Sequence, residues 1–246
     1  MWDNAPLLRG IASTLFFCSI VAILYGAGHY IVQSPRLLPI QSVRLQDVPQ
    51  RVVAADVLAR VRQDVQGNFL TVDIDHLRRS LETLPWVRKV SIRREFPNRL
   101  AVVFEEHQPL ARWNEAALVN TLGEVFVAET AQELPGFIGV EGSSQEVAQH
   151  YAQFNRQLAA LNLQVKKLVL SPRHAWQLHL SNEMVVELGR EAMQPRLARF
   201  VAVYPYSLGA AVPEGKGAAV MPGHAVQVVD MRYQHGFTVR TRRGNA

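Results

Sequence analysis

The sequence predicts a single N-terminal transmembrane helix followed by an α+β region of two domains. Three patterns predict this: an apolar run at residues 11–32, a strand-helix-helix-strand-strand pattern at 40–107, and short strands with two amphipathic helices at 108–242. Strands and helices segregated within so short a unit are typical of helices packed on a small mixed sheet. The remaining stretches are expected to be a head at 1–10, a linker at 33–39 and a flexible tail at 243–246.

The apolar run at 11–32 contains no Asp, Glu, Lys or Arg. A helix of roughly 20 apolar residues spans the hydrocarbon core of a bilayer. The alternative is a secretory signal peptide, but its apolar stretch is only about 7–15 residues long and ends in small residues. This run instead ends in Tyr30, Ile31 and Val32. We therefore expect a membrane anchor, with the short head left in the cytoplasm and the large tail exported.

The composition restricts the chemistry of the exported tail. The only cysteine, Cys18, lies inside the apolar run, so the tail has no thiol for catalysis or metal binding, which fits an oxidising compartment. The net charge is +5, but basic residues are scattered among acidic ones. This distribution favours a solvated surface over a nucleic-acid-binding site.

The first domain is predicted from periodicity and from the residues that end each element. Asp73 is a candidate N-cap for a helix that Pro85 ends, and Pro97-Asn98 is a turn dipeptide between two strands. The five expected elements are a strand at 40–45, helices at 57–65 and 74–84, and strands at 87–96 and 100–106.

The second domain is predicted to be richer in strands. Ser143 and Glu146 form a capping-box pattern before a helix, and Ser181-Asn182 separates two strands of a hairpin. The expected elements are strands at 110–113, 118–121 and 124–127, a helix at 147–161, strands at 176–180 and 184–188, a helix at 193–204, and strands at 225–233 and 237–242.

No constellation of residues predicts an enzyme or a bound cofactor or metal. His174 and His179 are five residues apart on an expected strand, so they point to opposite faces and do not share a metal. Gly215-Lys216-Gly217 lacks the Ser or Thr of a phosphate-binding loop. Glu105 and Glu106 are strand neighbours that face opposite ways, which does not suit a general acid and base. We therefore expect no small-molecule substrate.

The segment 226–233 is apolar on both of its faces. One interpretation is an edge strand that a partner covers, because an apolar edge with unpaired backbone groups favours the addition of a strand. The other is a central strand buried on both faces. The pattern leaves the two alternatives open.

Several stretches together resemble the FtsQ/DivIB family of bitopic cell division proteins. They are LPWVRKV at 84–90, Phe96-Pro97-Asn98, Ala111-Arg112-Trp113-Asn114, Trp176-Gln177-Leu178, Leu188-Gly189-Arg190, RLARF at 196–200, and VDMRY at 229–233 with Gly236. The resemblance covers nearly the whole chain.

The resemblance implies that residues 40–107 form a POTRA domain and residues 108–242 a β domain. It also implies a non-enzymatic protein of the cell inner membrane at the division septum, with its head in the cytoplasm and its domains in the periplasm. Family members form a complex with the small bitopic proteins FtsB and FtsL. They link early division proteins to the septal peptidoglycan synthase.

The resemblance further implies a partner site on the last strand of the β domain. It places Asp230, Arg232, Tyr233 and Gly236 against a strand of FtsB, and Arg190 against an acidic group of that partner. These residue types suit the role, because Tyr is an amphipathic anchor, Arg pairs with carboxylates and Gly allows a close backbone approach. Family members often carry a Trp a few residues beyond the glycine, and here Phe237 is the candidate replacement.

Contacts of the POTRA domain with other division proteins are expected at Lys89, Ile92 and Arg94 of the strand at 87–96. The alternative function is a POTRA-type assembly or secretion factor that binds unfolded β-rich clients. Such proteins usually carry many amphipathic strands of about 10 residues that close into a barrel. The short strands and intervening helices predicted here argue against it.

Overall fold

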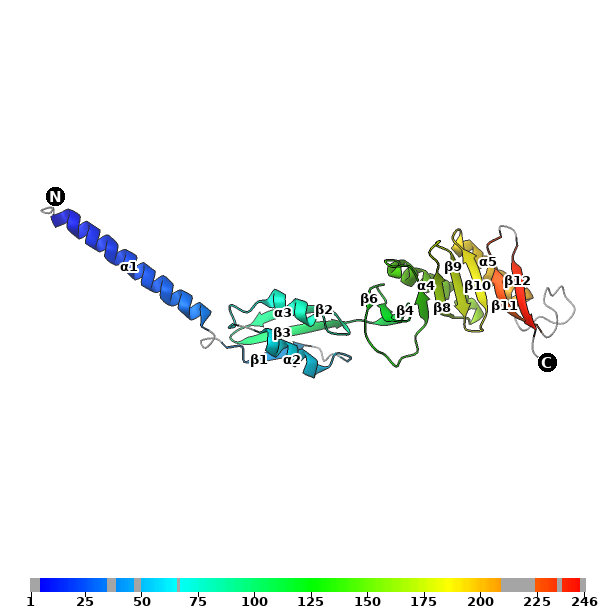
Figure 1. Ribbon diagram of the computed structural model, residues 1–246, viewed down its shortest axis with the longest axis horizontal. Coiled ribbons are helices and arrows are strands. Elements are labelled where there is room, and N and C mark those ends of the chain that lie inside the picture. Colours follow the sequence, from blue (N-terminus) through cyan, green and yellow to red (C-terminus); the bar gives the residue numbers. More distant parts are fainter. Residues whose placement is uncertain are drawn as a thin grey trace. The chain divides into compact units, whose positions relative to one another are not determined.

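The computed structural model describes residues 5–34, 39–46, 50–65, 67–208, 224–233 and 236–243 (Figure 1). The chain divides into two compact units, Met1–His107 and Gln108–Ala246.

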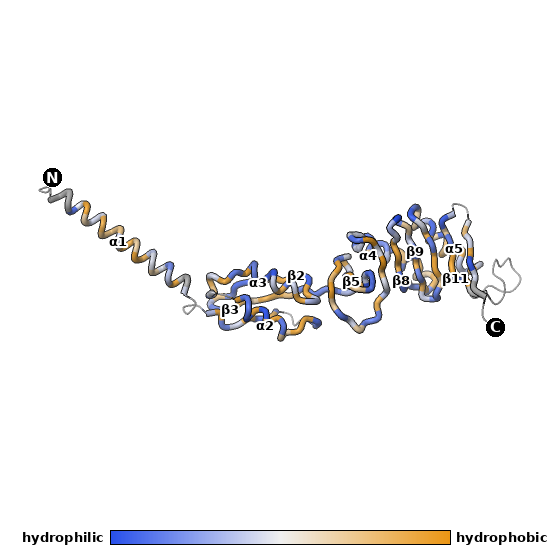
Figure 2. The backbone as a smooth tube through the Cα atoms, viewed as in Figure 1, coloured by the Kyte–Doolittle hydropathy of each residue, from blue (hydrophilic) through white to orange (hydrophobic). Residues whose placement is uncertain are grey.

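The first unit begins with helix α1, Ala5–Gln33. Its segment Arg9–Ile31 is long and apolar enough to cross a membrane, and apolar residues occupy most of its length (Figure 2). The side chains of Phe16 and Tyr25 are 70% and 75% exposed. The helix therefore shows apolar side chains all round rather than the single stripe of a soluble amphipathic helix, as the sequence predicts.

The rest of the first unit has the expected order of strand, helix, helix, strand, strand (Figure 1). Its elements are β1 Ser42–Gln46, α2 Ala54–Asp64, α3 Ile74–Leu81, β2 Val87–Glu95 and β3 Arg99–Glu106. The sheet order is β1-β3-β2, with β1 parallel to β3 and β2 antiparallel to it. Both β1 and β2 are therefore edges of the sheet.

The two helices cover one face of this sheet. Val57, Leu77 and Leu81 of the helices are fully buried and belong to the same core cluster as Leu100 and Val102 of β3. Asp73 is the N-cap of α3, as predicted: its Oδ1 accepts the backbone N–H of His76 at 2.9 Å. That hydrogen bond also lowers the pKa of Asp73, because it favours the ionised carboxylate.

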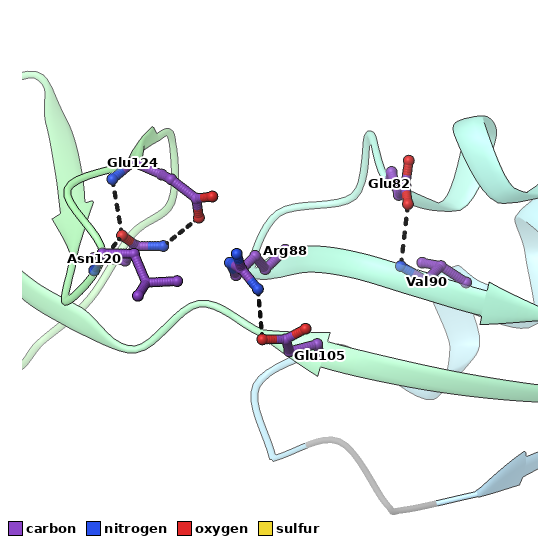
Figure 3. Close-up of polar contacts among 7 residues, drawn as sticks. Glu82, Arg88, Val90, Glu105, Asn120 and Glu124 are labelled. Atoms are coloured by element: carbon purple, nitrogen blue, oxygen red, sulfur yellow. Dashed lines mark hydrogen bonds and ion pairs between the residues drawn. The ribbon is translucent and has the colours of Figure 1, made fainter. Parts of the chain in front are cut away.

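The side chain of Glu82 occupies part of the backbone hydrogen-bonding edge of β2. Glu82 accepts the outward backbone N–H of Val90 at 3.1 Å, and Arg88 pairs with Glu105 across the β2–β3 hairpin at 2.5 Å (Figure 3). An edge N–H that already has an acceptor is not open to a partner strand.

The second unit is a nine-stranded mixed sheet with the order β12-β11-β10-β9-β8-β7-β4-β5-β6. Its strands are β4 Pro109–Trp113, β5 Ala117–Asn120, β6 Val125–Phe126, β7 Gly136–Ile138, β8 Val165–Leu170, β9 Trp176–Leu180, β10 Val185–Gly189, β11 His224–Asp230 and β12 Thr238–Arg243. Its helices are α4 Ser144–Leu158, the 3-10 turn η1 Ala159–Leu161, and α5 Met193–Ser207.

The helices pack on one face of this sheet around an aromatic core. Phe137, Phe154, Trp176 and Phe200 are at most 2% exposed and come from β7, α4, β9 and α5. At the far end of the sheet, buried Asn120 shapes the β5–β6 turn. Its Oδ1 accepts the backbone N–H of Glu124 at 2.9 Å (Figure 3) and that of Leu122 at 2.9 Å. The mixed β domain with two helices is therefore confirmed.

Three details differ from the sequence predictions. Strands β7 and β8 were not expected. In β8 a register shift between Val165 and Lys167 breaks the alternation that marks a strand. Ser143 precedes α4 but does not cap it with its side chain, because its hydroxyl donates to the carbonyl of Val140 at 2.7 Å.

Of the two interpretations left open for segment 226–233, the structure supports the internal strand. Residues 224–230 form β11, which pairs with β10 on one side and β12 on the other. Val229 and Met231 are completely buried, and the strand ends at Asp230. The edge strand at this end of the sheet is β12, the last strand in the described part of the chain.

Candidate functional site

The candidate site lies at the β12 end of the nine-stranded sheet, where β10 and β11 end, β12 begins, and helix α5 starts (Figure 1). It contains all six residues implicated in the second domain: Arg190 directly after β10, Asp230, Arg232 and Tyr233 at and after the end of β11, and Gly236 and Phe237 before β12.

β12 pairs only with β11 among the residues that the structure describes. Alternate backbone N–H and C=O groups along its other side therefore point away from the sheet. Phe237 and Val239 are half-buried and pack against the core, whereas Thr238 and Arg240 are exposed. The strand is anchored by one face and leaves its edge open to another strand.

Arg232 and two carboxylates form an ion cluster at the ends of β10 and β11. Arg232 donates to Asp230 from Nε to Oδ1 at 2.9 Å and from Nη2 to Oδ2 at 2.6 Å, and its Nη2 lies 3.2 Å from Oε2 of Glu187 on β10. The hydrogen bonds from Arg232 lower the pKa of Asp230 and raise the pKa of Arg232. Most of the charge of Arg232 is therefore already compensated within the chain.

Gly189 makes room for this cluster. Its φ is +74°, a left-handed conformation that side chains disfavour, and an added Cβ would lie 3.0 Å from both Arg196 Nη1 and Arg232 Cγ. Arg196 donates to the carbonyl of Leu188 at 2.6 Å. The absence of a side chain at Gly189 thus lets two arginines lie across the end of β10.

Arg199 of α5 holds the segment that follows β11. Its Nη2 donates to the carbonyls of Met231 and Tyr233, at 3.3 and 2.8 Å. Buried Met231 fixes one end of this segment, while the side chain of Tyr233 is 55% exposed. The side chain of Tyr233 therefore faces solvent, while its backbone carbonyl is fixed by Arg199.

Two grooves adjoin Tyr233 and Arg190, with volumes of about 490 and 340 Å³. Their charged lining residues are Arg173, Arg190, Arg196, Arg199, Arg232 and Glu191. The side chain of Arg190 is 71% exposed and pairs with its neighbour Glu191 at 3.4 Å, an interaction that water weakens. This surface is chemically suited to a segment that carries carboxylates.

Gly236 is half-buried, and an added Cβ would meet no atom within 4 Å. The free fold therefore does not require a glycine here.

The three candidate residues of the first unit do not share one surface. Lys89 is exposed on the open face of the sheet, while Ile92 packs against the core beneath the helices. Arg94 donates to the carbonyls of Phe69 at 3.0 Å and Val72 at 2.8 Å, so it secures the loop before α3. Contacts with other division proteins at Lys89, Ile92 and Arg94 therefore remain a prediction, and Lys89 is the one of the three on the open face of the sheet.

The described part of the chain holds no group of three or more His, Cys, Asp and Glu side chains placed to bind a metal. His174 lies in the turn before β9 and not on the strand as expected. His179 lies on β9, where burial and, to a lesser extent, the charge of Lys167 lower its pKa.

Sequence reasoning missed Glu187, Gly189, Arg196 and Arg199 as parts of the site. Three of them lie in the stretches that resemble the family, but nothing in the local pattern shows which way their side chains point. Only the parallel pairing of β10 with β11 brings them beside Asp230 and Tyr233.

Two family models match consecutive parts of the chain. Residues 38–107 match the POTRA domain of FtsQ type, and residues 111–232 match the C-terminal region of cell division protein FtsQ/DivIB. The match to the second model ends at Arg232, directly before Tyr233.

Similar proteins match over almost the whole chain. Cell division protein FtsQ of Burkholderia pseudomallei is 35% identical over 98% of this chain and 94% of the relative. The protein of the same name from Nitrosospira multiformis is 36% identical over 99% of this chain and 100% of the relative. That of Escherichia coli K12 is 35% identical over 96% and 85%.

Proposed function

The chain belongs to the FtsQ/DivIB family of cell division proteins, and we propose that it is a non-enzymatic scaffold that binds FtsB by adding a strand to β12. Through FtsB and FtsL it would link early division proteins to septal peptidoglycan synthesis. The observation that carries the proposal is the position of β12 as the edge of the nine-stranded sheet, next to the exposed Tyr233.

The proposed topology is a single pass through the inner membrane at the division septum, with the head at residues 1–10 in the cytoplasm and the chain beyond α1 in the periplasm. The apolar helix and the family support membrane anchoring. The ten-residue head carries one basic residue, Arg9, and is short enough to stay behind while the folded tail is exported.

Strand addition would satisfy the open backbone groups of β12 with those of the partner, and side chains at the edge would provide specificity. Tyr233 offers a large amphipathic contact whose backbone Arg199 already fixes, so little entropy is lost on binding. Arg190 follows the end of β10, two strands in from this edge, and would pair with a carboxylate of FtsB where the partner chain continues past the strand ends.

The alternative, an assembly or secretion factor for β-rich clients, has less support. The strands of the second unit are 2 to 7 residues long and form an open sheet with helices on one face. No observation in the described part of the chain favours a client-binding channel over an edge for one partner strand.

The test is binding of the full chain, reconstituted in nanodiscs, to the membrane-distal segment of FtsB. We expect Tyr233→Ala to weaken binding by about thirtyfold, or about 2 kcal/mol, as for an anchor residue. The matched control is Tyr206→Ala, because Tyr206 is 80% exposed on α5 of the same unit and does not line either groove. Amide hydrogen exchange across β12 should slow when the partner binds.

Two results would contradict the proposal. Equal affinities of wild type and Tyr233→Ala would place the partner elsewhere. Slower exchange confined to other strands would show that binding does not use the β12 edge.

A further inference from the structure

The tip of the β2–β3 hairpin presents apolar side chains to solvent. Phe96 at this tip is 85% exposed, and Leu70 of the loop before α3 is 48% exposed. Arg94, two residues before Phe96, donates to the carbonyl of Leu70 at 3.4 Å, so the loop and the hairpin lie together. The two apolar side chains therefore belong to the same end of the domain.

This end of the domain is the one where the chain arrives from α1. The backbone N–H of Gln41 donates to the carbonyl of Asn98 in the hairpin tip at 3.0 Å, and Ser42 of β1 pairs with Arg99. Only eight residue steps separate Gln33, the last residue of α1, from Gln41, a span of at most about 29 Å.

A second contact ties the same end to the membrane helix. The side-chain Nδ2 of Asn68 donates to the carbonyl of Ser34, the residue directly after α1, at 3.1 Å. Asn68 also shapes the loop of Leu70, because its Oδ1 accepts the N–H of Leu70 at 2.9 Å. The loop that carries Leu70 is thus bonded to the end of the membrane helix.

The opposite end of the domain is marked by Glu106, the last residue of β3. Its Oε1 accepts the backbone N–H groups of Arg51 and Val52, both at 2.9 Å. β3 has eight residues, so this end lies about 23 Å from the hairpin tip. Val53 is 58% exposed there and provides an apolar side chain on the far end of the same domain.

The open face of the three-stranded sheet is basic next to the tip. Arg44 and Arg93 lie in one row across the sheet with Ala101, and Arg99 lies in the next row with Glu95. All three arginines are exposed. Two rows are about 7 Å apart, so the arginines lie close behind Phe96 and outnumber the single glutamate.

We propose that this tip rests on the surface of the bilayer that α1 spans, with Phe96 and Leu70 in the headgroup interface and Arg44, Arg93 and Arg99 against anionic phosphates. Aromatic side chains favour this interface, and basic clusters beside a membrane helix are attracted to anionic lipid. The inference rests on the membrane anchoring of the family and not on partner binding at β12. Its consequence is that the domain formed by β1 to β3 with α2 and α3 is held at the membrane surface in a restricted orientation.

The test uses the full chain in nanodiscs with Cys18→Ala, so that one new cysteine carries a nitroxide spin label. The label is placed at Leu70→Cys, with Val53→Cys as the matched exposed control at the far end. Accessibility to oxygen and to a water-soluble nickel complex is compared in discs of phosphatidylcholine alone and of equal parts phosphatidylcholine and phosphatidylglycerol. Incorporation of the protein into the disc shows, independently of the spin label, that α1 is inserted in the bilayer.

We expect the label at position 70 to be protected from nickel and accessible to oxygen, more strongly with phosphatidylglycerol, while the label at 53 stays open to nickel. Phe96→Asp should remove the protection at 70, and Arg93→Gln with Arg99→Gln should remove its dependence on phosphatidylglycerol. Equal nickel accessibility at 70 and 53 in discs that contain the protein would overturn the proposal and leave the tip for a protein partner. Protection at 70 that is unchanged by both sets of substitutions would overturn it as well.

Discussion

Arg232 binds the carboxylate of Asp230 with two hydrogen bonds at 2.9 and 2.6 Å, and both residues stand at the point where β11 leaves the sheet. The backbone N–H of Arg232 also donates to Asp230 Oδ1, at 3.0 Å. Together these bonds fix the direction in which the chain leaves β11 after Asp230 in the free protein. The path toward Tyr233 is therefore set before a partner arrives, which lowers the ordering cost of binding.

Replacing Asp230 by Asn keeps the shape of the side chain but removes its charge. We expect Asp230→Asn to lower the free energy of unfolding at neutral pH by about 1 kcal/mol, since charge-assisted hydrogen bonds are lost and Arg232 is partly exposed. Urea unfolding of the wild type and of Asp230→Asn measures this difference in the free energy of unfolding. A double-mutant cycle with Arg232→Gln isolates the pair.

The pH dependence of this effect follows from the lowered pKa of Asp230. A carboxyl group with a lowered folded pKa contributes its stabilisation fully above its unfolded pKa of about 3.8, and loses it as the pH falls through the folded value. The difference between wild type and Asp230→Asn should therefore shrink in acid below that range. A difference that is constant with pH would show that packing, and not charge, is responsible.

Arg190 should affect partner binding without affecting stability. Its side chain is 71% exposed, so Arg190→Glu is expected to leave the melting temperature unchanged. Affinity for the FtsB segment should fall by at least about tenfold at low salt, with a smaller loss at high salt, because salt screens exposed charges. Titrations at two salt concentrations measure this. Arg156→Glu on α4, also exposed and outside both grooves, is the control that should bind normally.

Much of the fold could be predicted because local chemistry marked the elements clearly. Asp73 caps α3, and Leu178 and Val186 alternate with half-buried neighbours in the β9–β10 hairpin. In β8 the register shift after Val165 removed the alternation, so the strand was missed although it lies inside the sheet.

The edge of the sheet could not be predicted from local pattern. β10 pairs with β11 in parallel, through a connection that contains α5, and β12 then folds back on β11. Apolar residues on both faces of β11 are compatible with an edge or an internal position. For the same reason the role of Arg199 was hidden, since it bonds carbonyls 32 and 34 residues away in the sequence.

Gly236 and Gly189 should respond in opposite ways to an added side chain. At Gly236 an added Cβ has open space, so Gly236→Leu should fold normally yet weaken binding if a partner backbone approaches there. At Gly189 the left-handed φ and the contacts to Arg196 and Arg232 predict that Gly189→Ala lowers the melting temperature. Calorimetry and binding titrations of both variants check this. Normal affinity of Gly236→Leu would mean that no partner backbone passes close to this residue.

Arg199 is expected to act on partner binding through Tyr233. Arg199→Ala removes both hydrogen bonds to the carbonyls of Met231 and Tyr233, so hydrogen exchange near these residues should rise. Affinity for FtsB should fall by about tenfold, measured at a temperature where the variant is folded. Arg199→Lys should restore part of the affinity, because an ammonium can still donate to one carbonyl.

The decisive comparison for Arg199 is made in the background of Tyr233→Ala. If Arg199 only positions Tyr233, its removal costs affinity when the tyrosine is present and almost nothing when the tyrosine is absent. If Arg199 instead binds a carboxylate of the partner directly from the groove that it lines, the two losses add in the double variant. Non-additive losses, together with partial rescue by Arg199→Lys, would therefore identify Arg199 as the residue that presents Tyr233 to the partner.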